Sequence, residues 1–82
     1  MAEKLIGKVT HYYDKLGVAI IELAGKLKVG DRVKFKKGEE ELEQEVTSMQ
    51  IEREQIETAK KGDIIGLKVD QEIKEKTEVY LM

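Results

Sequence analysis

The sequence contains no cysteine, no proline, no asparagine and no tryptophan, and it has a single histidine. Without cysteine the chain can form no disulfide, no thiolate metal site and no cysteine nucleophile, which fits a reducing, cytoplasmic environment. No stretch approaches the roughly 20 apolar residues of a membrane span, and the N-terminal residues carry no apolar signal segment. We therefore expect a cytoplasmic protein with no membrane partner.

An excess of charge of one sign is also missing. The chain has 15 Lys and Arg against 17 Asp and Glu, which gives a net charge of -2. Any contact with RNA would have to rest on a local basic patch, because nucleic-acid-binding domains usually carry a clear basic excess. The abundance of Glu, Lys, Ile and Val, with asparagine absent, resembles thermophile composition, although the absence of proline runs against it.

The motifs of common catalytic sites are missing too. There is no GxxxxGK[ST] phosphate loop, which excludes a GTPase built from this chain alone. His11 has no cysteine or second histidine with which to hold a metal, so we expect it on a strand face. No Glu lies in a segment that suggests the apolar enclosure needed for acid–base catalysis. We expect no enzyme activity, no catalytic residues, no cofactor and no metal.

What is present is a pattern of short extended segments. With 82 residues, 40% of them hydrophobic, the chain is long enough for one packed domain spanning 1–82. Its β-branched and aromatic residues gather in short runs, which is typical of strands. The predicted strands are Leu5 to Tyr13, Leu16 to Leu23, Arg32 to Lys36, Leu42 to Arg53, Ile64 to Val69 and Thr77 to Met82. The first two should form a hairpin, and a phase slip near Thr47 and Ser48 predicts a β-bulge.

An internal repeat marks where strands begin. Residues 28–35 and 60–67 share the pattern Lys, any, Gly, Asp, any, apolar, any, apolar, and residues 74–81 repeat it more weakly. Glycine permits the positive φ of a tight turn, and aspartate can hydrogen-bond nearby backbone. The repeat predicts strand entry rather than a phosphate-binding loop.

A helix competes for the segment 42–60. Leu42, Val46, Met49 and Ile56 fall at coiled-coil spacing among strong helix formers, whereas Arg53 occupies a position that should be apolar. Val46-Thr47-Ser48 favours a strand, and periodicity alone leaves both alternatives open.

The order of these segments resembles the second domain of translation elongation factor Tu and other translational GTPases. The resemblance covers nearly the whole chain, and its landmarks are Gly25, LKVGDRV at 27–33, the segment 46–51 and AKKGDIIGL at 59–67. It implies an all-β fold, a closed or nearly closed six-stranded antiparallel Greek-key barrel, and it favours a strand over a helix for Leu42 to Arg53.

The opening of the chain departs from elongation factor Tu. The region from Thr10 to Gly17 does not match the apolar positions that hold the aminoacyl end of tRNA in that protein, so those positions do not carry over. Instead IGKVTHYYDKLGVAIIEL, residues 6–23, resembles small stand-alone elongation-factor-like proteins and the barrel appended to collagenase-like peptidases. The sequence contains no peptidase core.

The best candidate binding patch lies on the third predicted strand. Val33 and Phe35 should face inward, which leaves a basic patch of Arg32, Lys34 and Lys36 outside, with Lys37 beside it. Such a patch can contact phosphates, although a solvated strand face has the same pattern.

Two other groups of residues are candidate surface features. The neighbouring tyrosines Tyr12 and Tyr13 should point to opposite faces of their strand, one to the core and one to the surface, and the outward one is a candidate for stacking on a base. The glutamates at 39, 40, 41, 43 and 45 predict a soluble hairpin that discourages edge pairing.

Two functions follow as expectations. The first is a non-enzymatic, stand-alone elongation-factor-like binding module that contacts RNA, a ribonucleoprotein or a protein partner. The alternative is an accessory barrel that acts in trans with a separate peptidase-like or GTPase enzyme. The sequence does not specify an oligomeric state.

Overall fold

The computed structural model describes residues 4–52 and 54–82. These residues contain no helix and form ten strands joined by turns. The strands are β1 (Lys4–Tyr13), β2 (Val18–Leu23), β3 (Leu27–Lys28), β4 (Arg32–Lys37), β5 (Glu40–Glu45), β6 (Met49–Ile51), β7 (Glu54–Ile56), β8 (Thr58–Ala59), β9 (Ile64–Lys68) and β10 (Glu78–Leu81). The all-β prediction is confirmed, and the helical alternative is wrong throughout 42–52 and 54–60. None of the described elements is a helix of the length and apolar character that a bilayer span requires.

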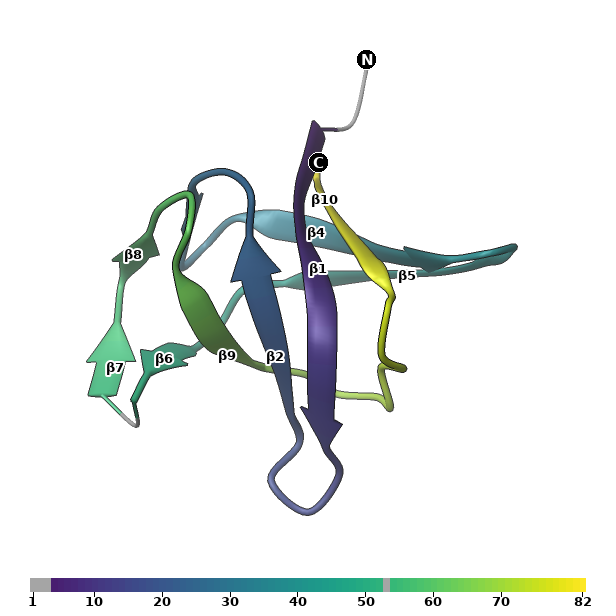
Figure 1. The fold of residues 1–82 in the computed structure, drawn as a ribbon, viewed down its shortest axis with the longest axis horizontal. Helices are drawn as coiled ribbons and strands as arrows, with labels where there is room; N and C mark the ends of the chain where they lie inside the picture. The colour runs from purple at the N-terminus through teal and green to yellow at the C-terminus, as the bar shows by residue number, and fades with distance from the viewer. Residues whose placement is uncertain (1–3, 53) are drawn as a thin grey trace.

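All strand pairs are antiparallel, but the main sheet does not close. Its eight strands lie in the order β5-β4-β10-β1-β2-β9-β6-β7, and β3 pairs with β8 in a small second sheet. The two ends of this order, β5 and β7, do not pair with each other (Figure 1). The expected six-stranded, closed or nearly closed Greek-key barrel is therefore wrong in strand number and closure. The predicted hairpin is confirmed, because β1 and β2 pair from Gly7–Leu23 to Tyr13–Val18.

The expected long strand from Leu42 to Arg53 is divided in two, β5 and β6, and its last residue, Arg53, lies outside the described residues. Its first half, β5, pairs with β4, whereas Met49 of β6 pairs with Leu67 of β9 on the far side of the sheet. The chain crosses between these two partners through residues 46–48, so the expected bulge at Thr47 and Ser48 is instead a strand break. Val46 and Met49 are both buried at the ends of this crossing, which explains the slip in apolar phase.

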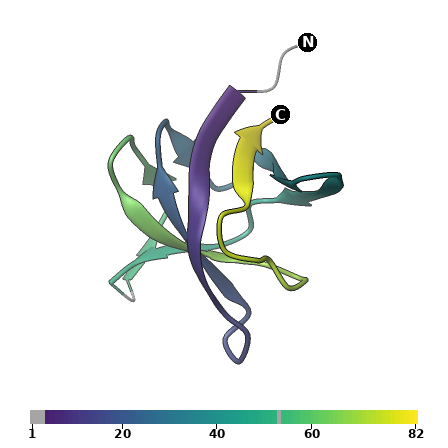
Figure 2. The same ribbon diagram turned by 45° about the vertical axis from the view of Figure 1, so that its right-hand side comes forward.

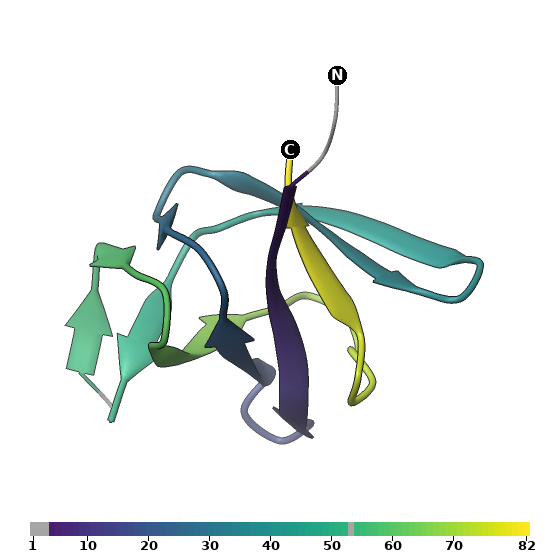
Figure 3. The ribbon, with the colours of Figure 1, turned by 45° about the horizontal axis from the view of Figure 1, so that its top comes forward.

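One apolar core lies within the curved sheet. Its residues come from both ends of the strand order, and the views in Figures 2 and 3 show β4 and β9 curving to opposite sides of β1. The most deeply buried large side chains are Ile6, Val9, Ile21, Leu27, Val33, Val46, Met49, Ile65, Leu67 and Val79. Val33 and Phe35 of β4 point inward as predicted. Burying each such side chain stabilises the fold by about 1.5–3 kcal/mol.

The curvature of the sheet depends on β1, which lies near the middle of the strand order. Its pairing shifts register between Leu5 and Gly7 and again between Val9 and His11. Gly7 pairs with Leu23 on one side and Val79 on the other, and a Cβ at this position would lie 2.8 Å from Ile21 Cγ2. Glycine is required here because the strand bends where the neighbouring strand approaches its backbone.

The repeated Lys-any-Gly-Asp motif forms the same turn twice. In the first turn the Asp31 N–H donates to Lys28 O at 3.1 Å, and Asp31 Oδ2 accepts from the Lys28 N–H at 3.1 Å. In the second, Asp63 N–H donates to Lys60 O and Asp63 Oδ2 accepts from the Lys60 N–H, both at 3.0 Å. The predicted strand entry is confirmed, and each aspartate bonds the backbone of the lysine three residues before it.

The weaker third copy of the motif forms a related turn without glycine. Thr77 donates to Lys74 O from its N–H at 3.3 Å and from its hydroxyl at 2.6 Å. Gly30 and Gly62 have φ of 99° and 94°, and Lys76 occupies the same place in the third turn with φ 71°. A lysine in this left-handed region is disfavoured by about 1–2 kcal/mol, because its Cβ crowds the following carbonyl.

We expect Lys76→Gly to raise the free energy of unfolding by about 0.5–1 kcal/mol, because relief of the left-handed backbone outweighs the added entropy of the unfolded chain. Urea denaturation measures the change. Lys61→Gly is the matched control, because Lys61 precedes the glycine of the second turn and its φ is not positive. That control should lower stability, and equal effects of the two substitutions would contradict the explanation.

Candidate functional site

The predicted basic patch on β4 lies directly against a row of glutamates. Arg32, Lys34 and Lys36 are paired across the strands with Glu45, Glu43 and Glu41 of β5, respectively. Residues directly opposite in an antiparallel pair share a face of the sheet, so each cation stands beside a carboxylate. On its other side, Lys36 is opposite Glu78 of β10.

Two ion pairs between described residues link the strands on this face. Lys34 Nζ lies 2.8 Å from Glu41 Oε1, and Arg32 Nε lies 3.7 Å from Glu43 Oε1. The hydrogen bond from Lys34, together with its positive charge, holds the pKa of the Glu41 carboxyl below its ordinary value. The acidic hairpin that sequence analysis treated as a separate soluble feature thus neutralises the predicted phosphate-binding strand.

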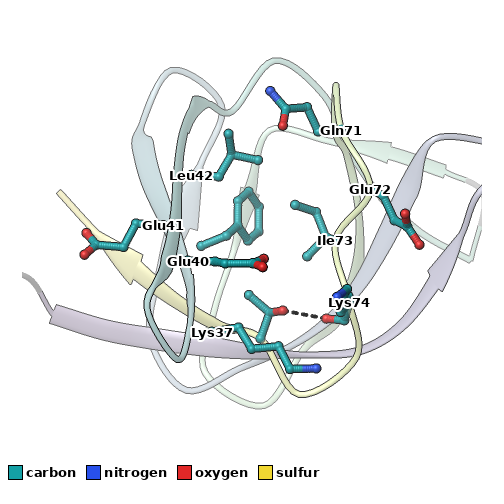
Figure 4. A pocket seen from close by; sticks show the side chains of 10 residues that line it. Lys37, Glu40, Glu41, Leu42, Gln71, Glu72, Ile73 and Lys74 are labelled. Atoms are coloured by element: carbon teal, nitrogen blue, oxygen red, sulfur yellow. Dashed lines mark hydrogen bonds between the residues drawn. The ribbon is translucent and has the colours of Figure 1, made fainter.

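Lys37 does not join the other three residues. Its position in the two-residue alternation of β4 places it on the same face as Val33 and Phe35, and its Nζ donates to Glu75 O at 3.2 Å. It lines a cleft between β5 and the segment before β10 (Figure 4). The structure therefore brings Arg32, Lys34 and Lys36 to one face and places Lys37 on the other.

Replacing Lys34 with Gln should return the pKa of Glu41 toward its ordinary value, because both the hydrogen bond and the positive charge are removed. Since the folded-state pKa of Glu41 is the lower one, the pair stabilises the fold above the ordinary carboxyl pKa, and this stabilisation is lost as pH falls through the lowered pKa. A carbon-detected NMR titration of Glu41 measures the shift. Lys36→Gln should move this pKa less, and a larger shift in that variant would contradict the assignment.

The tyrosine prediction is confirmed. Tyr12 is half-buried and packs against the core, whereas the Tyr13 side chain is exposed. The rings of Tyr13 and His11 meet edge to face, with centroids 4.5 Å apart. His11 Nδ1 lies 3.1 Å from Glu75 Oε2, and within the described ranges no three His, Cys, Asp or Glu side chains are grouped to hold a metal.

An apolar surface that the sequence pattern did not predict lies on the outer face of β2 and β9 and at the turn before β2. Tyr13, Leu16 and Ile64 are exposed there by 46%, 71% and 58%. Ile20 is half-buried beside them, and together these four side chains line an open hollow of about 740 Å³. We call these four residues and Gly66 the apolar hollow.

Gly66 gives this surface its concave shape. It lies between Ile20 of β2 and Gln50 of β6, with its missing side chain on the outer face. A Cβ at this position would lie 3.0 Å from Val18 Cγ1. The signal in the sequence was Ile64-Ile65, because two adjacent isoleucines on a strand must point to opposite faces and one of them is therefore exposed.

Comparisons with known proteins give similarity to a protein described as a protease and to solved C-terminal domains of a protein described as a U32 peptidase. No protein-family model matches the sequence. An uncharacterized protease of Methanocaldococcus jannaschii is 41% identical over 78 residues, which cover 94% of this chain and 19% of that protein. The chain therefore spans about a fifth of the length of this relative.

Two solved structures share the fold. The crystal structure of the C-terminal domain of a protein described as a U32 peptidase, from Geobacillus thermoleovorans, superposes with a TM-score of 0.89 and 21% identity, covering 96% of this chain and 92% of that one. Its selenomethionine variant gives a TM-score of 0.87 at 21% identity, covering 94% and 98%. These similarities agree with the resemblance to the barrel appended to peptidases. The resemblance to elongation factor Tu stays a prediction.

Proposed function

We propose that this chain is a non-enzymatic accessory domain that binds a separate peptidase-like protein through the apolar hollow. The similarity to the M. jannaschii protease supports the identity of the partner, because the matched region is a minor part of a much longer protein. Interfaces between domains of one chain resemble those between separate proteins. A domain that packs against a peptidase core in the same chain could therefore bind that core as a separate chain, provided that the interface is adequate.

The apolar hollow is the observation that carries the proposal. Charged residues make up 39% of the sequence, yet Leu16, Ile64 and Tyr13 are exposed together around one concavity. Contiguous exposed apolar surface with a polar rim is typical of a protein–protein contact. Glu52 and Asp63 stand at the edge of the hollow and supply such a rim.

The RNA-binding alternative has less support. It was motivated by Arg32, Lys34 and Lys36, and the carboxylates opposite them reduce the positive potential that phosphates would meet. Tyr13 offers a base only part of its ring, because His11 contacts it. The non-enzymatic part of the proposal rests on the sequence, which has no cysteine and one histidine, and on the exposed position of that histidine beside Glu75.

The test measures binding to the M. jannaschii protease from which the matching 78 residues are deleted. Isothermal titration should detect a complex with the wild-type chain. Leu16→Glu and Ile64→Glu should each weaken it about thirtyfold or more, because a carboxylate would be buried in an apolar contact. Both side chains are largely exposed in the free chain, so neither substitution should unfold it.

Val29→Glu is the matched control. Val29 is 40% exposed and lies outside the apolar hollow, so this substitution should leave the affinity unchanged. Equal affinity of the wild-type chain and both hollow variants would overturn the proposed surface. Salt-dependent tRNA binding that is lost when Arg32, Lys34 and Lys36 are all changed to Ala would favour the RNA alternative instead.

A further inference from the structure

β5 is an edge strand with a cleft beside it. It is the first strand in the sheet order, and within residues 4–52 and 54–82 it pairs with β4 alone. The cleft has a volume of about 300 Å³ and lies between β5 and residues 71–77. In Figure 4, Leu42 and Glu40 from β5 face this space from one side, and Ile73 faces it from the other.

The register identifies which backbone groups of β5 are available. The Val46 N–H donates to Asp31 O at 2.7 Å and Val46 O accepts from the Gly30 N–H at 2.8 Å, so Val46 directs its backbone groups toward the β4 side. Backbone groups alternate along an antiparallel strand, so Leu42 and Gln44 share this direction. The N–H and C=O groups of Glu41 and Glu43 therefore point to the free edge.

The floor of the cleft is apolar. Phe35 and Ile73 are 2% and 4% exposed, and Leu42 is half-buried beside them. Gln44 fixes one end, because its side-chain amide donates to Lys68 O at 2.6 Å and its Oε1 accepts from the Asp70 N–H at 3.2 Å. An apolar side chain entering the cleft from an added strand would meet this floor.

The outer face of the same strand selects the charge of the occupant. Glu41, Glu43 and Glu45 are exposed and point away from the core. Lys34 and Arg32 form ion pairs with Glu41 and Glu43 from the β4 side, so a strand laid against the other edge of β5 has the carboxylates as its nearest charges and the cations one strand further away. Alternate side chains of that strand are therefore favoured as Lys or Arg rather than as acidic residues. A second copy of this chain is disfavoured for that reason, since β5 paired with itself would set glutamates against glutamates.

We propose that β5 binds an extended peptide of alternating basic and apolar residues by strand addition, with an apolar side chain in the cleft. Backbone hydrogen bonds to Glu41 and Glu43 supply affinity, and the cleft and the glutamates supply selectivity. This site is separate from the apolar hollow and does not depend on the proposed peptidase partner.

The test uses a synthetic peptide of alternating Lys and Val, six residues long, with an alternating Glu and Val peptide as control. NMR titration of the full chain should show saturable shifts at 40–45 and 71–77 with the basic peptide only. Glu43→Pro should weaken binding about tenfold or more, because it removes a donor at the free edge without removing a bond to β4. Glu43→Ala separates the loss of charge from the loss of the donor and should weaken binding less than Glu43→Pro.

Three outcomes would overturn the proposal. One is equal binding of the two peptides, and another is equal affinity of Glu43→Pro and Glu43→Ala. The third is a concentration-dependent dimer of the chain alone that Glu43→Pro abolishes, which would assign the edge to a second copy. Backbone shifts of Glu43→Pro away from residues 40–45 should match those of the wild-type chain, which establishes that the variant is folded.

Discussion

The close approach of β1 to β2 at Gly7 is the contact on which the rest of the structure depends. A side chain there would collide with Ile21 Cγ2 at 2.8 Å and approach Glu22 O at 3.1 Å. Without one, β1 can bend and pair with β2 and β10 on its two sides. This bend lets the sheet curl, so that Val33 from one end of the strand order and Leu67 from the other share one core without closing a barrel.

The curl also determines how the surface is divided. β4 and β5 carry opposite charges on their outer faces, and their register brings these charges together, so that much of the formal charge on that side is cancelled locally. Among the described residues no such pair lies on the outer face of β2 and β9, which exposes apolar side chains around Gly66. A chain with nearly balanced net charge thus has two unlike surfaces, one apolar and one a polar strand edge above an apolar cleft.

Much of this architecture was predicted from the sequence because it depends on local rules. Alternation of apolar and polar residues identified β1, β2, β4, β9 and β10, and the repeated glycine–aspartate pairs located the turns before β4 and β9. The inward positions of Val33 and Phe35 and the division of Tyr12 from Tyr13 follow from the same two-residue period. The division of the segment 42–53 into two strands was visible in the sequence only as a slip in the apolar phase. The end of β5 and the start of β6 are determined by pairing with β4 and β9, which are other segments of the chain.

The sequence by itself determined the segments that are extended, their inward faces and the turns that begin them, since these depend on side-chain alternation and backbone conformation within a few residues. Only the tertiary structure decided that the sheet stays open, that the cations of β4 stand against the glutamates of β5, and that Leu16 and Ile64 meet beside Gly66. Strand order and register are set by packing between segments far apart in the chain. The two-residue alternation of a strand does not depend on which strand lies beside it, so the alternation alone cannot identify its neighbours.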